Sequence, residues 1–191
     1  MKILKPKQMK KYSLIIMVLF MGTSVFAQKF VTKSGHIRFY SETPMETIEA
    51  DNRQVNSAYD HENGAFVFKV LMKSFEFEKA LMQEHFNENY VESDDFPNAF
   101  FKGKIINNED IHLSKIGEVP VKVEGQLTLH GITMDVTADG VMNVQKDKIS
   151  ASSKILIEPK EYDIKIPGAV VKNIAKEIEV YINVDLKKLS K

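Results

Sequence analysis

The chain has 191 residues, of which 43% are hydrophobic and 27% are charged, with 26 basic and 26 acidic residues and no cysteine. The absence of cysteine excludes disulfides, thiolate metal sites and a cysteine nucleophile. A chain of this length is expected to fold around one core, and that core must supply its stability without cross-links.

The first 27 residues have the layout of a secretory signal peptide. Five lysines and no acidic residue precede the apolar run Leu14–Met21, and a small-x-Ala site ends at Ala27. Eight apolar residues are too few for a membrane span, which needs roughly 20. We therefore expect cleavage after Ala27, export to the bacterial periplasm or beyond the cell, and no stable membrane anchor afterwards.

Residues 28–191 would form one mature domain. Loss of the five leader lysines leaves 21 basic against 26 acidic residues, a formal charge of −5. An acidic balance argues against nucleic acid, and against a generally anionic membrane surface, as the partner.

The first half of the mature chain shows period-two alternation of apolar and polar residues. Phe66, Phe68 and Val70 fall on one face of a strand, and Ala65 and Val67 fall on the other. Such alternation predicts a strand with one buried face. The strands predicted in this half lie at about 36–40, 46–50, 54–60 and 65–70.

A short amphipathic helix is predicted over residues 78–87. At 100° per residue, Leu81, Met82, His85 and Phe86 fall on one side of it. A single helix of this length is not stable alone in water. We therefore expect it to dock across one end of a larger structure.

The second half again consists of predicted strands, at about 99–106, 119–129, 134–138, 149–157 and 178–186. Residues 159–176 lack alternation and predict a long excursion before the last strand, of the kind that borders an opening. Short strands with turn signals between them indicate an all-β antiparallel sandwich or barrel.

Motifs for chemistry are missing from the sequence. The five histidines lack metal-ligand spacing, and no nucleophile elbow, phosphate loop or dinucleotide fingerprint occurs. The position of His85 predicts a core or rim histidine, and that of His130 predicts a residue that caps a turn beside Gly131. We expect no catalytic residue, no metal and no cofactor.

The many phenylalanines raise a question about the interior. A barrel of about eight strands is either filled by its own side chains or open enough to hold one small ligand. Aromatic and methionine side chains suit the open case, because they form wide and adaptable apolar walls. The residues by themselves leave both possibilities open.

Two blocks of sequence, in this order, resemble the YceI-like family. The first contains Met82–Asn87, Tyr90–Ser93, Phe96-Pro97 and a Phe-Lys-Gly strand. The second, Gly125–Thr133, is similar to the family's G-x-L-T-x-H-G-x-T strand and turn. The resemblance implies a single antiparallel lipocalin-like β-barrel with one short helix, and homodimerisation as a possibility.

It also implies an apolar channel that holds a long-chain amphiphilic lipid, such as a polyisoprenoid, an isoprenoid quinone or a fatty-chain lipid. The residues expected to line this channel are Phe66, Phe68, Phe75, Phe77, Leu81, Met82, Phe86, Phe101, Val123, Leu127 and Met134. One alternative is a non-catalytic structural or protein-interaction barrel with a filled core and residues 159–176 as its contact surface. Another is an enzyme acting on a lipid head group, with His85 or His130 as general base.

Overall fold

The structure, a computed structural model, describes residues 28–189, so the predicted signal peptide lies outside the described residues. In this part of the chain one antiparallel sheet contains the strands β1 (Lys29–Glu42), β2 (Thr47–Asp60), β3 (Ala65–Leu71), β4 (Glu76–Phe77), β5 (Asn98–Ile105), β6 (Gly117–Leu129), β7 (Ile132–Val144), β8 (Lys148–Ile157) and β9 (Ile178–Lys188). The helical segments are α2 (Ala80–His85), the wider turn η2 (Phe86–Tyr90), and the short 3₁₀ turns η1 (Met72–Ser74), η3 (Asn108–Asp110) and η4 (Pro159–Tyr162).

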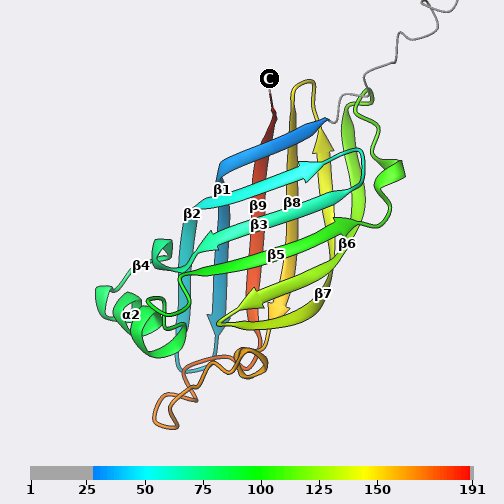
Figure 1. Cartoon of the computed structure of the whole chain (residues 1–191). Coiled ribbons are helices and arrows are strands. Elements are labelled where there is room, and N and C mark those ends of the chain that lie inside the picture. Colours follow the sequence, from blue (N-terminus) through cyan, green and yellow to red (C-terminus); the bar gives the residue numbers. More distant parts are fainter. Residues whose placement is uncertain (1–27, 190–191) are drawn as a thin grey trace, which may run out of the picture.

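The sheet closes into a barrel (Figure 1). Neighbouring strands follow the order β1-β9-β8-β7-β6-β5-β3-β2, and β2 pairs with β1 to complete the ring. The short strand β4 is an addition that pairs with the part of β2 that β3 does not reach. The predicted fold, an antiparallel barrel of about eight strands with one short helix, is confirmed.

Strand β2 differs from the sequence prediction, which divided it into two strands at 46–50 and 54–60. Gly35 pairs with Val55 and Ile37 pairs with Asn52, so β1 advances by two residues where β2 advances by three. The pairing of the two strands therefore shifts register at this point. Asn52 is fully buried, and its Nδ2 donates to the carbonyl of Leu71 at 2.9 Å. This bulge interrupts the alternation without ending the strand, so the prediction of two strands was wrong.

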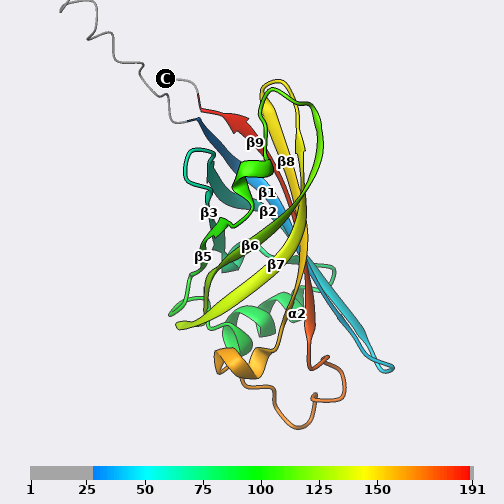
Figure 2. The same cartoon turned by 90° about the vertical axis from the view of Figure 1, so that its right-hand side faces the viewer.

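Strand β1 begins and strand β9 ends at the same end of the barrel (Figure 2). A dense apolar cluster fills this closed end, and Tyr59, Met142, Ile149 and Leu186 within it are completely buried. A polar network lies beside it: the Tyr59 hydroxyl donates to Asn108 Oδ1 at 2.6 Å, and its oxygen is 3.1 Å from His61 Nδ1.

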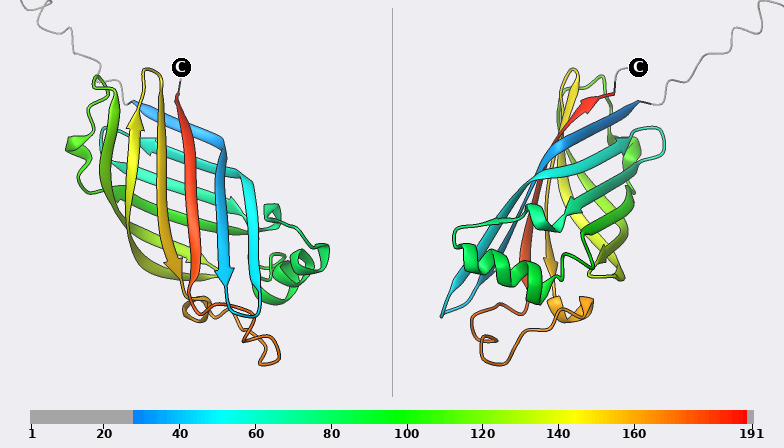
Figure 3. Two further views of the ribbon diagram at one scale, coloured as in Figure 1. Left: turned by 180° about the vertical axis from the view of Figure 1, so that it is seen from behind. Right: turned by 60° about the vertical axis from the view of Figure 1, so that its left-hand side comes forward.

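The opposite end carries the helix, the β1–β2 hairpin and the segment 158–177 (Figure 3). The helix is docked there, as predicted, but it is α-helical only over Ala80–His85 and continues to Tyr90 as the wider turn η2. Within residues 28–189, no helix is both long and apolar enough to cross a membrane.

Candidate ligand-binding cavity

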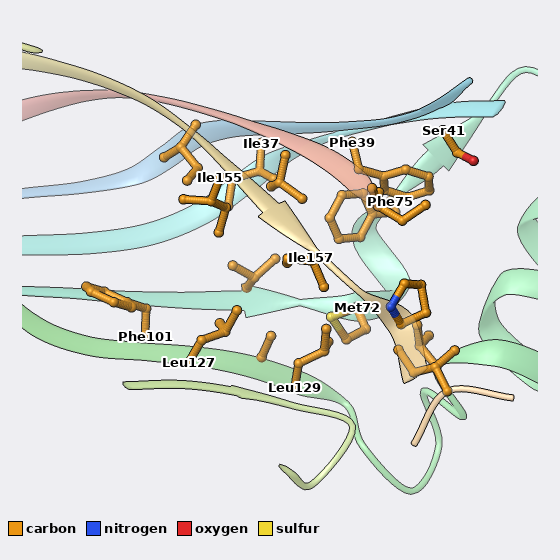
Figure 4. A pocket seen from close by; sticks show the side chains of 18 of the residues that line it. Ile37, Phe39, Ser41, Met72, Phe75, Phe101, Leu127, Leu129, Ile155 and Ile157 are labelled. Atoms are coloured by element: carbon orange, nitrogen blue, oxygen red, sulfur yellow. The ribbon is translucent and has the colours of Figure 1, made fainter. Parts of the chain in front are cut away.

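A cavity of about 370 Å³ lies inside the barrel and opens at the end that carries α2 (Figure 4). All eight barrel strands contribute to its walls, together with α2 and the segment 158–177. Ile37 of β1, Leu127 and Leu129 of β6, and Ile155 of β8 point into it from three different strands. The inward face of each strand is apolar because apolar residues alternate with polar ones along the chain.

Four aromatic rings form the wall closest to the mouth. Phe39 of β1 lies 5.5 Å from Phe75, 5.6 Å from Phe77 and 5.5 Å from Phe86, measured between ring centroids. Phe86, at the end of α2, also contacts Phe77 at 5.1 Å. This four-ring cluster (Phe39, Phe75, Phe77 and Phe86) fixes the helix against the barrel, since such pairs contribute about 0.5–1.5 kcal/mol each beyond their buried area.

A second aromatic group lies deeper, toward the closed end. Phe68 is 4.7 Å from Phe66 and 6.2 Å from Phe101. Phe101 lies over two glycines that face each other across the β5–β6 pair, Gly103 and Gly125. A β-carbon at Gly103 would be 2.5 Å from the tip of the Phe101 ring. The two glycines thus let the ring lie close to the wall.

Polar groups gather at the mouth. The Ser41 hydroxyl accepts from the backbone N–H of Ala175 at 2.9 Å, and Glu46 Oε2 accepts from Asn173 Nδ2 at 3.0 Å. Tyr90 also borders the cavity, and burial raises the pKa of its hydroxyl, which therefore stays neutral. The mouth is the part of the cavity best able to hold a polar head group.

His130 connects three segments beside the mouth. Its Nδ1 donates to the carbonyl of Tyr162 at 2.9 Å, its Nε2 lies 2.8 Å from Glu92 Oε2, and its ring packs against Phe96. Gly131 has the positive φ that the turn requires, 76°, and His130 itself has φ 49°. His130 holds the segment 158–177 to the barrel and does not line the cavity.

Nine of the eleven residues expected along the channel lie on the cavity wall, and two do not. Those on the wall are Phe66, Phe68, Phe75, Phe77, Met82, Phe86, Phe101, Val123 and Leu127. Leu81 is 61% exposed, because the helix turns Met82, His85 and Phe86 toward the barrel and Leu81 to the outside. Met134 lies on β7 two residues before Val136, which lines the cavity, but Met134 itself is 36% exposed and does not line it.

Sequence reasoning missed a large part of the wall. Phe39, the inward residues of β8 and β9 such as Ile155, Val180 and Ile182, and Ile164 of the segment 158–177 all line the cavity. The strand β9 was predicted correctly. Its alternation of apolar and polar residues contained the necessary signal, because the apolar face of a strand in an open barrel points to the cavity.

The arrangement is suited to holding an apolar chain. Among residues 28–189, no group of three or more histidine, cysteine or carboxylate side chains is placed to hold a metal ion. His85 lies at the rim, on the cavity side of the helix, as its position in the predicted apolar stripe suggested. Both ring nitrogens of His130 are already engaged by other protein groups.

Solved structures share this fold at low sequence identity. A polyisoprenoid-binding domain from Saccharophagus degradans superposes with a TM-score of 0.72 at 11% identity, covering 85% of this chain and 99% of that one. BcnA from Burkholderia cenocepacia gives 0.62 at 12% identity, covering 80% and 95%. The YceI protein of Campylobacter jejuni gives 0.56 at 15% identity, covering 73% and 84%.

A search of curated protein sequences found no match. The family model described as the YceI-like domain matches residues 17–186, most of the chain. The barrel, its helix and the two sequence blocks agree with that match, and the protein belongs to the YceI-like family.

Proposed function

We propose that the protein is an exported carrier or sequestering protein that binds a long-chain amphiphile, a polyisoprenoid, an isoprenoid quinone or a fatty-chain lipid, in the barrel cavity. The observation that carries this proposal is the largely apolar wall between the mouth and the filled closed end, which only Ser152 and Ser153 of β8 interrupt. The cavity volume of about 370 Å³ falls within the ~300–1,000 Å³ typical of small-molecule sites.

Burial of the chain would supply most of the binding energy. Each CH₂ group removed from water contributes about 0.8 kcal/mol, so a long tail needs no specific polar contact. The depth of the cavity would limit chain length, and Ser41, Glu46, Tyr90 and Asn173 at the mouth would select the head group. The name of the Saccharophagus degradans domain, which states that it binds polyisoprenoids, supports this ligand class.

The alternative of a structural barrel with a filled core is disfavoured by the cavity itself. A filled barrel would bring side chains from opposite strands into contact along its whole length. Such contact occurs here in the closed-end cluster, whereas the mouth half encloses space. We assign no reaction to the protein.

The first test is native mass spectrometry of residues 28–191, purified without detergent, followed by organic extraction. A stoichiometric adduct with the mass of a prenyl or fatty-chain lipid is expected. A protein that stays free of ligand after incubation with quinones and fatty amides would refute lipid binding.

A matched set of variants locates the site. The double variant Phe68→Asp and Met82→Asp places two carboxylates on the apolar wall and is expected to weaken binding about tenfold or more. Val67→Asp is the control, because Val67 neighbours Phe68 on β3 but is 39% exposed on the outer face. Unchanged affinity in the folded double variant would contradict the channel assignment.

Export is tested separately. The leader pattern of residues 1–27 supports it, and we expect the protein recovered from a periplasmic fraction to begin at Gln28. Recovery of the intact N-terminus from the cytoplasm alone would contradict export without affecting the ligand proposal.

A further inference from the structure

Large apolar side chains stand exposed around the mouth of the cavity. Met45 is 70% exposed at the tip of the β1–β2 hairpin, Leu81 is 61% exposed on α2, and Val171 is 52% exposed in the segment 158–177. These three residues do not line the cavity and therefore gain nothing from a ligand inside it. Single exposed apolar residues are common, but three on separate segments around one opening form a rim.

Hydrogen bonds and an ion pair hold the three segments together. Glu46, next to Met45, accepts from Asn173 at 3.0 Å and lies 3.7 Å from Lys79 Nζ, so it connects the hairpin to the residues flanking Val171 and Leu81. The hairpin tip is itself closed by the Thr43 hydroxyl, which donates to the Glu46 carbonyl at 3.0 Å. The three segments that carry this apolar rim (Met45, Leu81 and Val171) lie at one end of the molecule (Figure 3).

The charge around this rim favours one kind of partner. The hairpin tip, the helix region and the segment 158–177 together carry more acidic residues than lysines. An anionic membrane would therefore gain no attraction here, whereas a zwitterionic bilayer accepts apolar side chains into its interface without needing positive charge.

The cavity opens within the rim, so a ligand must enter and leave there. A long-chain amphiphile resides in bilayers, and each methylene that passes through water adds to the barrier for its transfer. We infer that the protein docks its mouth on the surface of a zwitterionic lipid bilayer by inserting Met45, Leu81 and Val171, and so exchanges its ligand directly with the membrane. The inference rests on the proposed function and adds the membrane surface as partner.

The test uses the absence of tryptophan from the chain. Leu81→Trp places one fluorescent reporter in the rim, and Ile116→Trp places one at an equally exposed apolar position, 71% exposed, in the β5–β6 connection near the closed end. With phosphatidylcholine vesicles, the emission of Leu81→Trp is expected to shift to the blue and that of Ile116→Trp to stay unchanged. The shift should persist at high salt, because apolar insertion is not screened.

A second variant separates docking from ligand binding. Met45→Glu with Val171→Glu, in the Leu81→Trp background, is expected to weaken partition into these vesicles about tenfold or more. The same variant should take up a quinone delivered in ethanol as well as the parent does, measured by native mass spectrometry.

Three results would overturn the docking inference. They are an unshifted Leu81→Trp emission, an equal shift in Ile116→Trp, and a shift that requires anionic lipid. If Leu81→Trp shifts but neither protein binds quinone, docking stands and the proposed function fails instead.

Discussion

At the scale of single residues, the pair Gly103 and Gly125 sets the position of Phe101. A β-carbon at Gly125 would lie 2.4 Å from the Cα of Gly103, 2.5 Å from the carbonyl oxygen of Lys102 and 2.8 Å from the Phe101 ring. Two of these contacts are with backbone atoms, which cannot rotate away. Glycine is therefore required here for close approach of two strands and a ring.

Gly125→Ala is expected to reduce the free energy of unfolding by about 1–3 kcal/mol, the usual cost of overpacking. It should also push the Phe101 ring into the cavity and lower the amount of ligand retained. Chemical denaturation and native mass spectrometry measure the two effects. Gly168→Ala is the control, because nothing lies within 4 Å of its new methyl group. Equal stability of the two variants would contradict the argument.

His61 is expected to make the stability of the protein depend on pH. Burial lowers the pKa of His61 below its usual 6.5, and the nearby His112 lowers it further, while Asp60 opposes the shift. The unfolded chain therefore takes up this proton more readily than the folded one. The free energy that neutral His61 contributes to folding is fully present above the pKa that His61 has in the unfolded chain. It is lost as the pH falls through 6.5 toward the lower pKa that His61 has in the folded protein.

The free energy of unfolding is thus expected to fall as the pH drops through about 6.5, above the range in which carboxylates titrate. His61→Asn removes the titrating group and should flatten this part of the curve. Urea denaturation at a series of pH values measures it. A slope as steep in the variant as in the parent would assign the pH dependence to other groups.

At the scale of elements, one junction joins the β6–β7 turn, the loop after the helix and the segment 158–177. Three non-glycine residues with positive φ meet there: Glu92 at 44°, His130 at 49° and Asp163 at 52°. Such conformations cost free energy and persist only where the surroundings hold them. The hydrogen bonds of His130 to Glu92 and to the Tyr162 carbonyl are what hold this junction.

His130→Asn keeps a residue that tolerates positive φ but is too short to reach both partners. We expect it to lower stability by about 1–3 kcal/mol, because the carbonyl of the buried Tyr162 loses its partner. Amide hydrogen exchange should accelerate in residues 158–177, while exchange at the closed end stays slow. Unchanged exchange in the segment would show that other contacts hold it.

The elements also show what sequence can and cannot predict. Alternation is a local property, so the strands β3, β6 and β9 were predicted correctly, and in β3 the inward face as well. The bulge in β2 depends on its pairing with β1, and the exposure of Leu81 depends on how the helix docks. Both are set by contacts between distant segments, which no local pattern contains.

At the scale of the whole molecule, the barrel divides into an end that is packed and an end that encloses space. The closed-end cluster contains completely buried side chains from strands at both ends of the chain, such as Tyr59 and Leu186. The mouth half has fewer completely buried residues, and several of its wall side chains, such as Phe39, Phe77 and Phe86, are only partly buried. Stability and ligand binding are therefore carried by different parts of one sheet.

This division predicts opposite effects for two truncations. Met142→Ala, at a completely buried site that is not on the cavity wall, should cost about 2–5 kcal/mol of stability while the protein that remains folded still binds ligand fully. Phe39→Ala removes the ring that contacts Phe75, Phe77 and Phe86, and should weaken ligand binding more than Met142→Ala does. Denaturation curves and ligand occupancy, measured on both variants at a temperature where each is folded, give the comparison. If Met142→Ala lowered ligand occupancy as much as Phe39→Ala, the prediction would be wrong. The loss of packing at the closed end would then have affected the mouth through the sheet, and the two ends would act as a single unit.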